Sequence, residues 1–441
     1  MRSIEDTLSD SGTVPARLRF SRPRGLAFGD RPFRILARVA ANLRQARAMF
    51  RSGRPAAILA FGGYLAVVAL VLWQPDPAAP RRVFYWVLLA IGLALLTRTD
   101  LATLGRSNLL RIAAGFYLYL WATLLWAPGI SAFAVQGYAW RMTANFLFIA
   151  VTALLAARPG PLGRAPLLGT VALAAAAALF SIGMYFGAGY APPHRLGTLA
   201  WHSPNAVGVV FGALAVGAVA WSLGRSVASA ERVLSGSAGF LLAAATLLSM
   251  SRASLAAMAV GLLVAAACTR AWRLVLAGAV AAIGAGALLP LDPGLLEGLV
   301  ERGSSFRVVI WENFVHQALE RQWFGYSIIH DGETLLPDGR TVGGAHNVYL
   351  EALVFGGVPA LVGLLALFAV AGRIAWRAWR EDGQVMPIAF LAFIATHGMF
   401  ESQPFVHELD WHWLSFLLPF GLIAAREVAT GGVPLLRSSP R

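Results

Sequence analysis

The sequence contains no lysine, a single cysteine and little charge of either sign. All 36 basic residues are arginine, and with 22 acidic residues they give a formal net charge of +14 on 441 residues. The lone cysteine, Cys268, lies in an apolar run and excludes an intramolecular disulfide. CxxC and HExxH zinc patterns are absent, and no P-loop or GxGxxG motif follows a strand. We therefore expect neither a bound metal nor a cofactor.

Hydrophobic residues are as abundant as charged residues are scarce. They make up 58% of the chain and the mean hydropathy is +0.64, whereas soluble domains are about 45–50% apolar. The apolar runs predict an all-α integral membrane protein with about twelve transmembrane helices. These runs lie near residues 56–73, 83–97, 109–126, 139–157, 165–189, 205–222, 236–250, 254–269, 272–290, 347–371, 384–400 and 411–425.

The segment 1–55 is basic and precedes the first apolar run. It holds twelve arginines against four acidic residues, and it has no apolar core of the kind that a cleavable signal peptide requires. Between Pro32 and Phe50 apolar residues recur at helical spacing with arginines between them, which favours an interfacial helix on an anionic leaflet. A solvated basic tail is the alternative interpretation.

The distribution of arginine predicts the orientation of the chain. With the N-terminus in the cytoplasm, 27 of the 36 arginines fall on the cytoplasmic side of the expected spans. This agrees with the excess of arginine and lysine on cytoplasmic loops and accounts for the basic charge without nucleic acid. We expect nine transmembrane helices in 56–290, a large periplasmic loop at 291–346, three more helices in 347–425 and a cytoplasmic tail at 426–441.

The arginines on the expected outer side lie at helix ends, where they could bind an anion. Arg195, Arg252, Arg302 and Arg307 are such residues, and Arg141 is a further candidate. A guanidinium group binds phosphate through two hydrogen bonds and keeps its charge at any working pH. Several of them converging on one cavity would hold a diphosphate. The alternative is that each anchors its helix at the membrane interface.

One histidine lies where a polar, glycine-rich stretch runs into an apolar helix. His346 is followed by Asn347 and Tyr349. At a boundary between water and lipid, an imidazole can accept a proton near neutral pH. A structural role at the helix start is the alternative. His202 is a secondary candidate because it lies close to Arg195. The acidic residues on this side are scattered and are not paired as metal-binding carboxylates: Asp292, Asp331, Asp338, Glu401, Glu408 and Asp410.

Four segments together carry a family resemblance. They are RLGTLAWHSPNAVG at 195–208, SRASLAAMAVGLL at 251–263, FRVVIWENFVHQALERQWFGYSI at 306–328 and AHNVYLEALVFGGVPALVGLL at 345–365. With the predicted spans and large outer loop, they resemble the O-antigen ligase and polymerase superfamily over roughly residues 56–425. These membrane glycosyltransferases use glycans linked to undecaprenyl diphosphate. Ala253 replaces the usual glycine, and the proline that the family places near Gln322 is missing.

The resemblance implies both a fold and a site. The fold would be like that of family C glycosyltransferases, in the bacterial inner membrane, with both termini cytoplasmic and short helices in the periplasmic loop. His346 would activate the acceptor hydroxyl, and Arg195, Arg252 and Arg307 would bind the donor diphosphate, without metal or cofactor. The secondary candidates are Arg302, Asn347, Tyr349, His202 and Arg141.

Several activities stay open at this point. A ligase, which we favour, transfers the glycan en bloc to a sugar hydroxyl of the lipid A-core. A polymerase transfers it to another lipid-linked glycan, and a protein O-oligosaccharyltransferase transfers it to a protein side chain. A flippase or permease belongs to a different class and predicts charges at mid-bilayer depth inside helices. The sequence places almost none there.

Overall fold

The computed structural model describes residues 55–74, 85–86, 98–190, 194–198, 200–201, 203–271, 306–401, 406 and 410–431. Several expectations from the sequence lie outside these residues. They are the interfacial helix at 32–50, most of the span at 83–97, the span at 272–290, and two candidate side chains, His202 and Arg302.

The described residues are mainly helical, and they form a multi-pass membrane protein. Seven of the described helices are long and apolar enough to cross a bilayer, and shorter apolar helices cover Ala60–Trp73 and Met386–Gly398. The helices are α2 (Pro55–Trp73), α4 (Arg98–Leu104), α5 (Asn108–Ala122), the 3-10 helix η1 (Thr123–Trp126), α6 (Ala132–Ala156), α7 (Pro161–Gly187), α8 (Pro204–Ser222), α9 (Ser229–Ser249), α10 (Arg252–Thr269), α13 (Arg307–Glu320), α14 (Val348–Asp382), α15 (Met386–Gly398), the π-helix η2 (Trp413–Leu417) and α16 (Leu418–Ala429).

Helix α8 lies at the centre of one group of helices and packs against α9, α10 and α15. Small residues allow these backbones to approach closely. A Cβ atom at Gly208 would lie 2.7 Å from the side chains of both Ser249 and Ser251, and one at Gly217 would lie 2.2 Å from the ring of Phe390. The start of α8 is therefore held directly against the turn that joins α9 to α10.

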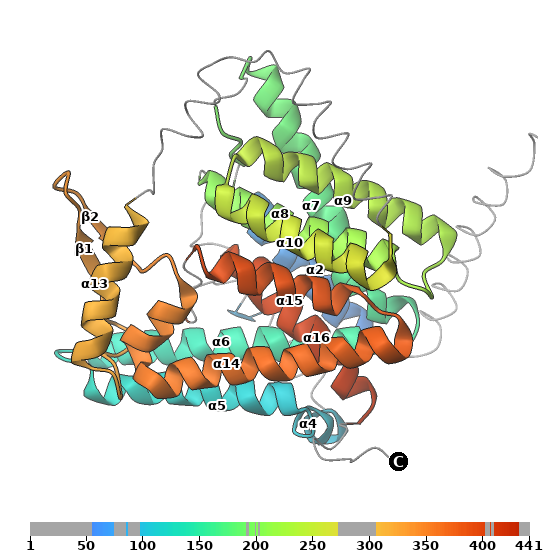
Figure 1. Cartoon of the computed structure of the whole chain (residues 1–441). Coiled ribbons are helices and arrows are strands. Elements are labelled where there is room, and N and C mark those ends of the chain that lie inside the picture. Colours follow the sequence, from blue (N-terminus) through green and yellow to red (C-terminus); the bar gives the residue numbers. More distant parts are fainter. Residues whose placement is uncertain are drawn as a thin grey trace, which may run out of the picture. The chain divides into compact units, whose positions relative to one another are not determined.

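A second group contains α5, α6, α14 and α16, and Figure 1 shows α5 and α14 running alongside each other. The buried carboxylate of Glu427 on α16 joins this helix to the start of α5. It accepts hydrogen bonds from Ser107 Oγ (2.9 Å), Asn108 Nδ2 (3.0 Å) and the backbone N–H of Leu109 (3.1 Å). A carboxylate at a helix N-terminus satisfies otherwise unpaired donors and interacts favourably with the helix dipole. This contact fixes the start of α5 against α16.

Helix α14 is broken after its first turns. Gly357 has φ 65° and ψ −165°, a conformation essentially restricted to glycine. A Cβ atom there would lie 2.3 Å from the carbonyl oxygen of Trp323. At the break, the backbone of the preceding loop hydrogen-bonds to α14: Tyr326 N–H donates to Val354 O (2.8 Å), and Val358 N–H donates to Gln322 O (2.8 Å). The loop after α13 is thus docked rigidly on α14, at the end of the molecule drawn at the left of Figure 1.

The loop also contains two strands that the all-α prediction did not include. β1 (Glu333–Leu335) pairs antiparallel with β2 (Thr341–Gly343), with Thr334 opposite Val342. The intervening Pro337, Asp338 and Gly339 explain this hairpin, because these residue types favour tight turns. Hydropathy alone does not reveal such short strands.

Candidate functional site

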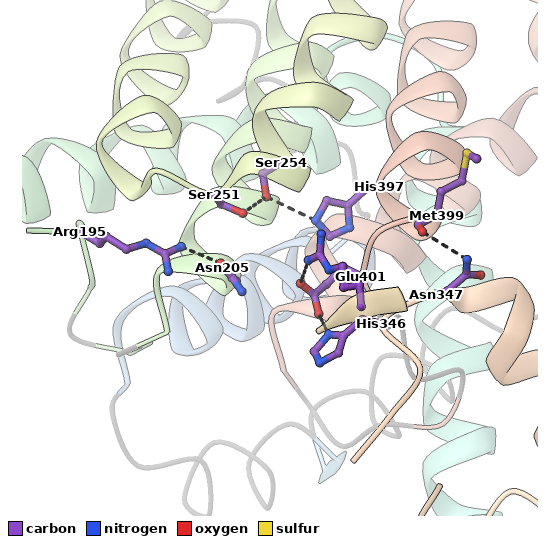
Figure 2. A network of polar contacts seen from close by, with 10 residues as sticks. Arg195, Asn205, Ser251, Ser254, His346, Asn347, His397, Met399 and Glu401 are labelled. Carbon is purple, nitrogen blue, oxygen red and sulfur yellow. Dashed lines mark hydrogen bonds and ion pairs between the residues drawn. The ribbon is translucent and has the colours of Figure 1, made fainter. Parts of the chain in front are cut away.

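The candidate site is formed where the ends of several helices meet. It includes Arg307 at the start of α13, His346 just before α14, Glu401 just after α15 and Arg252 at the start of α10. These residues are far apart in the sequence. Figure 2 shows His346 and Glu401 directed toward one another, with His397 on the other side of Glu401.

His346 and Glu401 form the central contact of the site. The imidazole Nδ1 is hydrogen-bonded to Oε1 of Glu401. Burial alone would raise the pKa of Glu401, but the hydrogen bond from His346 and the charges of His346 and Arg307 hold it below its ordinary value. Glu401 is therefore a carboxylate, which can only accept, so Nδ1 carries the proton. In the neutral ring Nε2 is then the nitrogen with a lone pair.

This contact also changes the basicity of the histidine. The hydrogen bond to Glu401 raises the pKa of His346 above its ordinary value, against the opposing effects of burial and of Arg307. A carboxylate that accepts from one ring nitrogen stabilises the imidazolium that forms when the other takes a proton. The pair can therefore accept a proton from a hydroxyl group placed against Nε2.

His346 has an unusual backbone conformation. Its φ of 48° lies in the left-handed region, which residues with a side chain rarely adopt. The neighbouring Ala345 N–H donates to the buried carboxylate of Glu351 (3.2 Å), and Asn347 caps the helix that follows. These contacts hold the conformation, and strain of this kind is concentrated at functional sites. Helix α14 begins at Val348, so His346 precedes the helix rather than forming its first turn.

Two arginines contribute positive charge to the site. Arg307 Nη2 lies 3.6 Å from Glu401 Oε2, with about a quarter of the arginine side chain exposed. Burial lowers the pKa of Arg307, the charge of Glu401 opposes this effect and the charge of Arg252 adds to it. Arg252, which is exposed, is therefore close enough to Arg307 for the two charges to interact. Both are compatible with an anion that bridges them.

Arg195 belongs to an adjoining loop and is tied to other partners. Its Nε donates to Ser249 O (2.8 Å), and its Nη2 donates to Asn205 Oδ1 (2.6 Å). Figure 2 shows Arg195 pointing to Asn205, on the opposite side of Ser251 from His346. The structure thus places Arg195 beside the α9–α10 turn that carries Arg252, and not in contact with the histidine.

A buried polar chain joins this turn to His397 on α15, whose carbonyl oxygen accepts from the N–H of Glu401 (3.0 Å). Ser251 Oγ lies 2.9 Å from Ser254 Oγ, and Ser254 Oγ lies 3.3 Å from Nε2 of His397. His397 is 1% exposed and Glu401 is 8% exposed. These side chains connect α10 with the end of α15, so they fix the position of Glu401 relative to Arg252.

The remaining candidates have structural contacts. Asn347 caps α14 by accepting from the N–H groups of Tyr349 (3.0 Å) and Leu350 (3.2 Å). Tyr349 donates to Ala395 O (3.2 Å), which attaches α14 to α15. Arg141 on α6 lies 5.0 Å from the ring centroid of Tyr138. The contacts of Asn347 and Tyr349 orient helices that carry the site, whereas the contact of Arg141 lies within α6.

Glu401, His397 and Ser254 were not predicted as site residues. Glu401 was weighed only as a possible metal-binding carboxylate, which would require a second acidic residue close to it in the sequence. The available signal was weaker: Glu401 is an acidic residue directly after the apolar helix α15, on the expected outer side. Within the described part of the chain, no three His, Cys, Asp or Glu side chains converge as metal ligands.

Comparison with known proteins adds two findings. A family model described as O-antigen ligase matches residues 237–365, which include Arg252, Arg307 and His346. The chain is also 27% identical over 376 residues to an O-antigen ligase of Pseudomonas aeruginosa strain PAO1. This match covers 82% of the chain and 89% of that protein.

Proposed function

The chain belongs to the O-antigen ligase superfamily of membrane glycosyltransferases, and on this premise we propose that it is an O-antigen ligase. It transfers a glycan en bloc from undecaprenyl diphosphate to a sugar hydroxyl of the lipid A-core. The reaction takes place on the periplasmic side of the bacterial inner membrane, and both termini of the chain are cytoplasmic. The observation that carries the proposal is the contact of His346 with Glu401, beside Arg307.

His346 is the general base of the proposed reaction. The acceptor hydroxyl gives its proton to Nε2 while its oxygen attacks the anomeric carbon of the first sugar of the donor. The bond between that carbon and the phosphate oxygen breaks, and undecaprenyl diphosphate leaves with the electron pair. Glu401 stabilises the imidazolium that results, and the product carries a new glycosidic bond.

Arg252 and Arg307 hold the diphosphate as its charge increases. Fixed cations that stabilise charge developing on a leaving group contribute strongly to catalysis in a site with little water. Arg307 is paired with Glu401 at 3.6 Å, so the same side chain connects the leaving group with the carboxylate behind the base. Arg195 supports the turn of Arg252 through Ser249, and it is the third arginine that we assign to the donor side.

The polymerase and the protein O-oligosaccharyltransferase use the same donor chemistry and differ in the acceptor. The name of the Pseudomonas relative favours the ligase among them. The assignment to an enzyme superfamily favours all three over a flippase or permease.

Lipopolysaccharide from a deletion strain, separated on a gel, tests the proposal. We expect the O-chains to disappear while long lipid-linked chains accumulate, and a plasmid copy of the gene should restore the ladder. Lipopolysaccharide with single-repeat caps would instead indicate a polymerase. Normal lipopolysaccharide together with loss of another glycan would indicate a different acceptor.

A further inference from the structure

An open cavity lies on the loop that follows α13, away from His346. Its volume is about 590 Å³, within the range of about 300–1,000 Å³ that small-ligand sites occupy. It is lined by Trp126, by Leu319 and Glu320 at the end of α13, and by residues 321–325. Neither the family model nor the proposed reaction assigns a function to it.

Two large aromatic side chains of this cavity are exposed. Trp323 is 64% exposed and Phe324 is 63% exposed. The ring of Phe324 meets that of Trp126 edge to face, with 6.1 Å between the centroids. Polar side chains stand beside these rings: Glu320, Arg321 and Gln322 all line the cavity and are exposed. Aromatic rings and a few polar groups are thus presented together on one surface.

This surface is held rigid by its backbone. Gly325 N–H donates to Arg321 O (2.9 Å), and the hydrogen bonds at the break in α14 fix the loop on both sides of the aromatic pair. Gly325, with φ 66°, packs so closely on α14 that a Cβ atom would lie 2.6 Å from Val354 O. A ligand that binds here therefore loses little free energy to ordering of the loop.

Helix α13 connects the cavity with the candidate active site. Arg307 is its first residue and Glu320 its last. At about 1.5 Å per residue, these fourteen residues span roughly 20 Å. The reacting sugar of the proposed donor lies at the Arg307 end, and the rest of its glycan must continue away from the diphosphate over the protein surface. Helix α13 runs from Arg307 to Glu320, which lines the aromatic cavity.

We propose that this cavity is a carbohydrate subsite that binds sugars of the donor glycan distant from the diphosphate. A pyranose ring has an apolar C–H face, which packs on an aromatic ring, and hydroxyl groups at its edge, which pair with guanidinium, amide and carboxylate groups. Trp323 and Phe324 supply the first kind of contact, and Arg321, Gln322 and Glu320 supply the second. This inference rests on the proposed function, because it names where the remainder of that donor binds.

Transfer by the purified protein in lipid nanodiscs, with donors of one repeat and of many repeats, tests the subsite. We expect Trp323→Ala to raise the KM for the long donor roughly tenfold, the factor that about 1.4 kcal/mol of lost contact produces. The KM for the single-repeat donor should stay unchanged, because that donor does not reach the cavity. Trp376→Ala is the matched control, since Trp376 is a 52% exposed tryptophan near the other end of α14.

Binding of O-polysaccharide freed from its lipid, measured by calorimetry on the inactive His346→Ala protein, provides an independent readout. We expect saturable binding that Trp323→Ala abolishes and Trp323→Phe retains, with Phe324→Ala as a second variant. Equal effects on both donors, unchanged binding in Trp323→Ala, or a preference for lipid-free core oligosaccharide would overturn the subsite. If the KM values of Trp323→Ala for both donors equal those of the unchanged protein, while His346→Ala still loses transfer, this inference is wrong and the proposed function stands.

Discussion

His346 donates from Nδ1 to a carboxylate oxygen of Glu401, a residue 55 positions further along the chain. The two side chains come from different helix ends, one before α14 and the other after α15. The histidine gains basicity from this contact, and the carboxylate also carries the ion pair with Arg307. One acidic side chain therefore joins the proposed base to Arg307, one of the proposed diphosphate-binding arginines.

Replacement of His346 by alanine removes the proposed base. A general base contributes a factor of about 10²–10⁴, so we expect transfer in His346→Ala to fall by that factor. The side chain is about one-third exposed, so the protein should still insert and keep its stability. Transfer is measured with purified protein and a defined donor. His316→Ala, at an exposed position on α13, is the control. A ladder and a rate like those of the unchanged protein would contradict the assignment.

Arg252→Lys and Arg307→Lys test whether these residues grip the diphosphate through paired hydrogen bonds. An ammonium group keeps the charge but cannot reproduce the planar fork, so each variant should lose roughly tenfold or more in kcat/KM for the donor. The control is Arg340→Lys, at a 70% exposed residue of the hairpin turn. Full activity in both variants, measured by the same assay, would show that a simple positive charge is sufficient.

The break in α14 gives a prediction about stability. Gly357→Ala places a Cβ atom against the Trp323 carbonyl and forces alanine into a conformation that glycine alone adopts readily. We expect a loss of about 1–3 kcal/mol or more of folding free energy. Gly115→Ala in α5 is the control, since its Cβ would meet no atom within 4 Å. The melting temperature in detergent measures this change in stability, with size-exclusion chromatography reporting the fraction of protein that remains folded after heating. Equal melting temperatures would mean that the loop does not need this break.

Hydropathy located the described apolar helices but not their full lengths. The run predicted at 347–371 belongs to a helix that continues to Asp382, and the run predicted at 236–250 belongs to one that begins at Ser229. In both cases the additional turns carry charged residues. Such residues form helix outside the apolar part of a span, where hydropathy gives no signal. The break at Gly357 was also missed, because it depends on a contact with the loop around Trp323.

The site was predictable only where a residue type was informative by itself. Arginines at helix ends on the expected outer side, and a histidine before an apolar helix, led to the prediction of Arg252, Arg307 and His346, which stays a prediction. Glu401 carried no comparable signal, because its function depends on two partners that are distant in sequence. The buried chain from Ser254 to His397 likewise depends on the packing of α10 against α15. Such contacts arise from the tertiary structure, and they do not produce a characteristic residue spacing that could be found in a single sequence.

The pH dependence of transfer by the unchanged protein and by Glu401→Gln tests the central claim most directly. The contact with Glu401 raises the pKa of His346, so transfer by the unchanged protein should decline on the acid side through a pKa above the ordinary histidine value of about 6.5. A neutral amide removes the negative charge that favours the imidazolium. In Glu401→Gln we therefore predict that this acid limb moves to lower pH, with a lower maximal rate because the ring is held less firmly. An acid limb that stays in place or moves to higher pH would contradict the account.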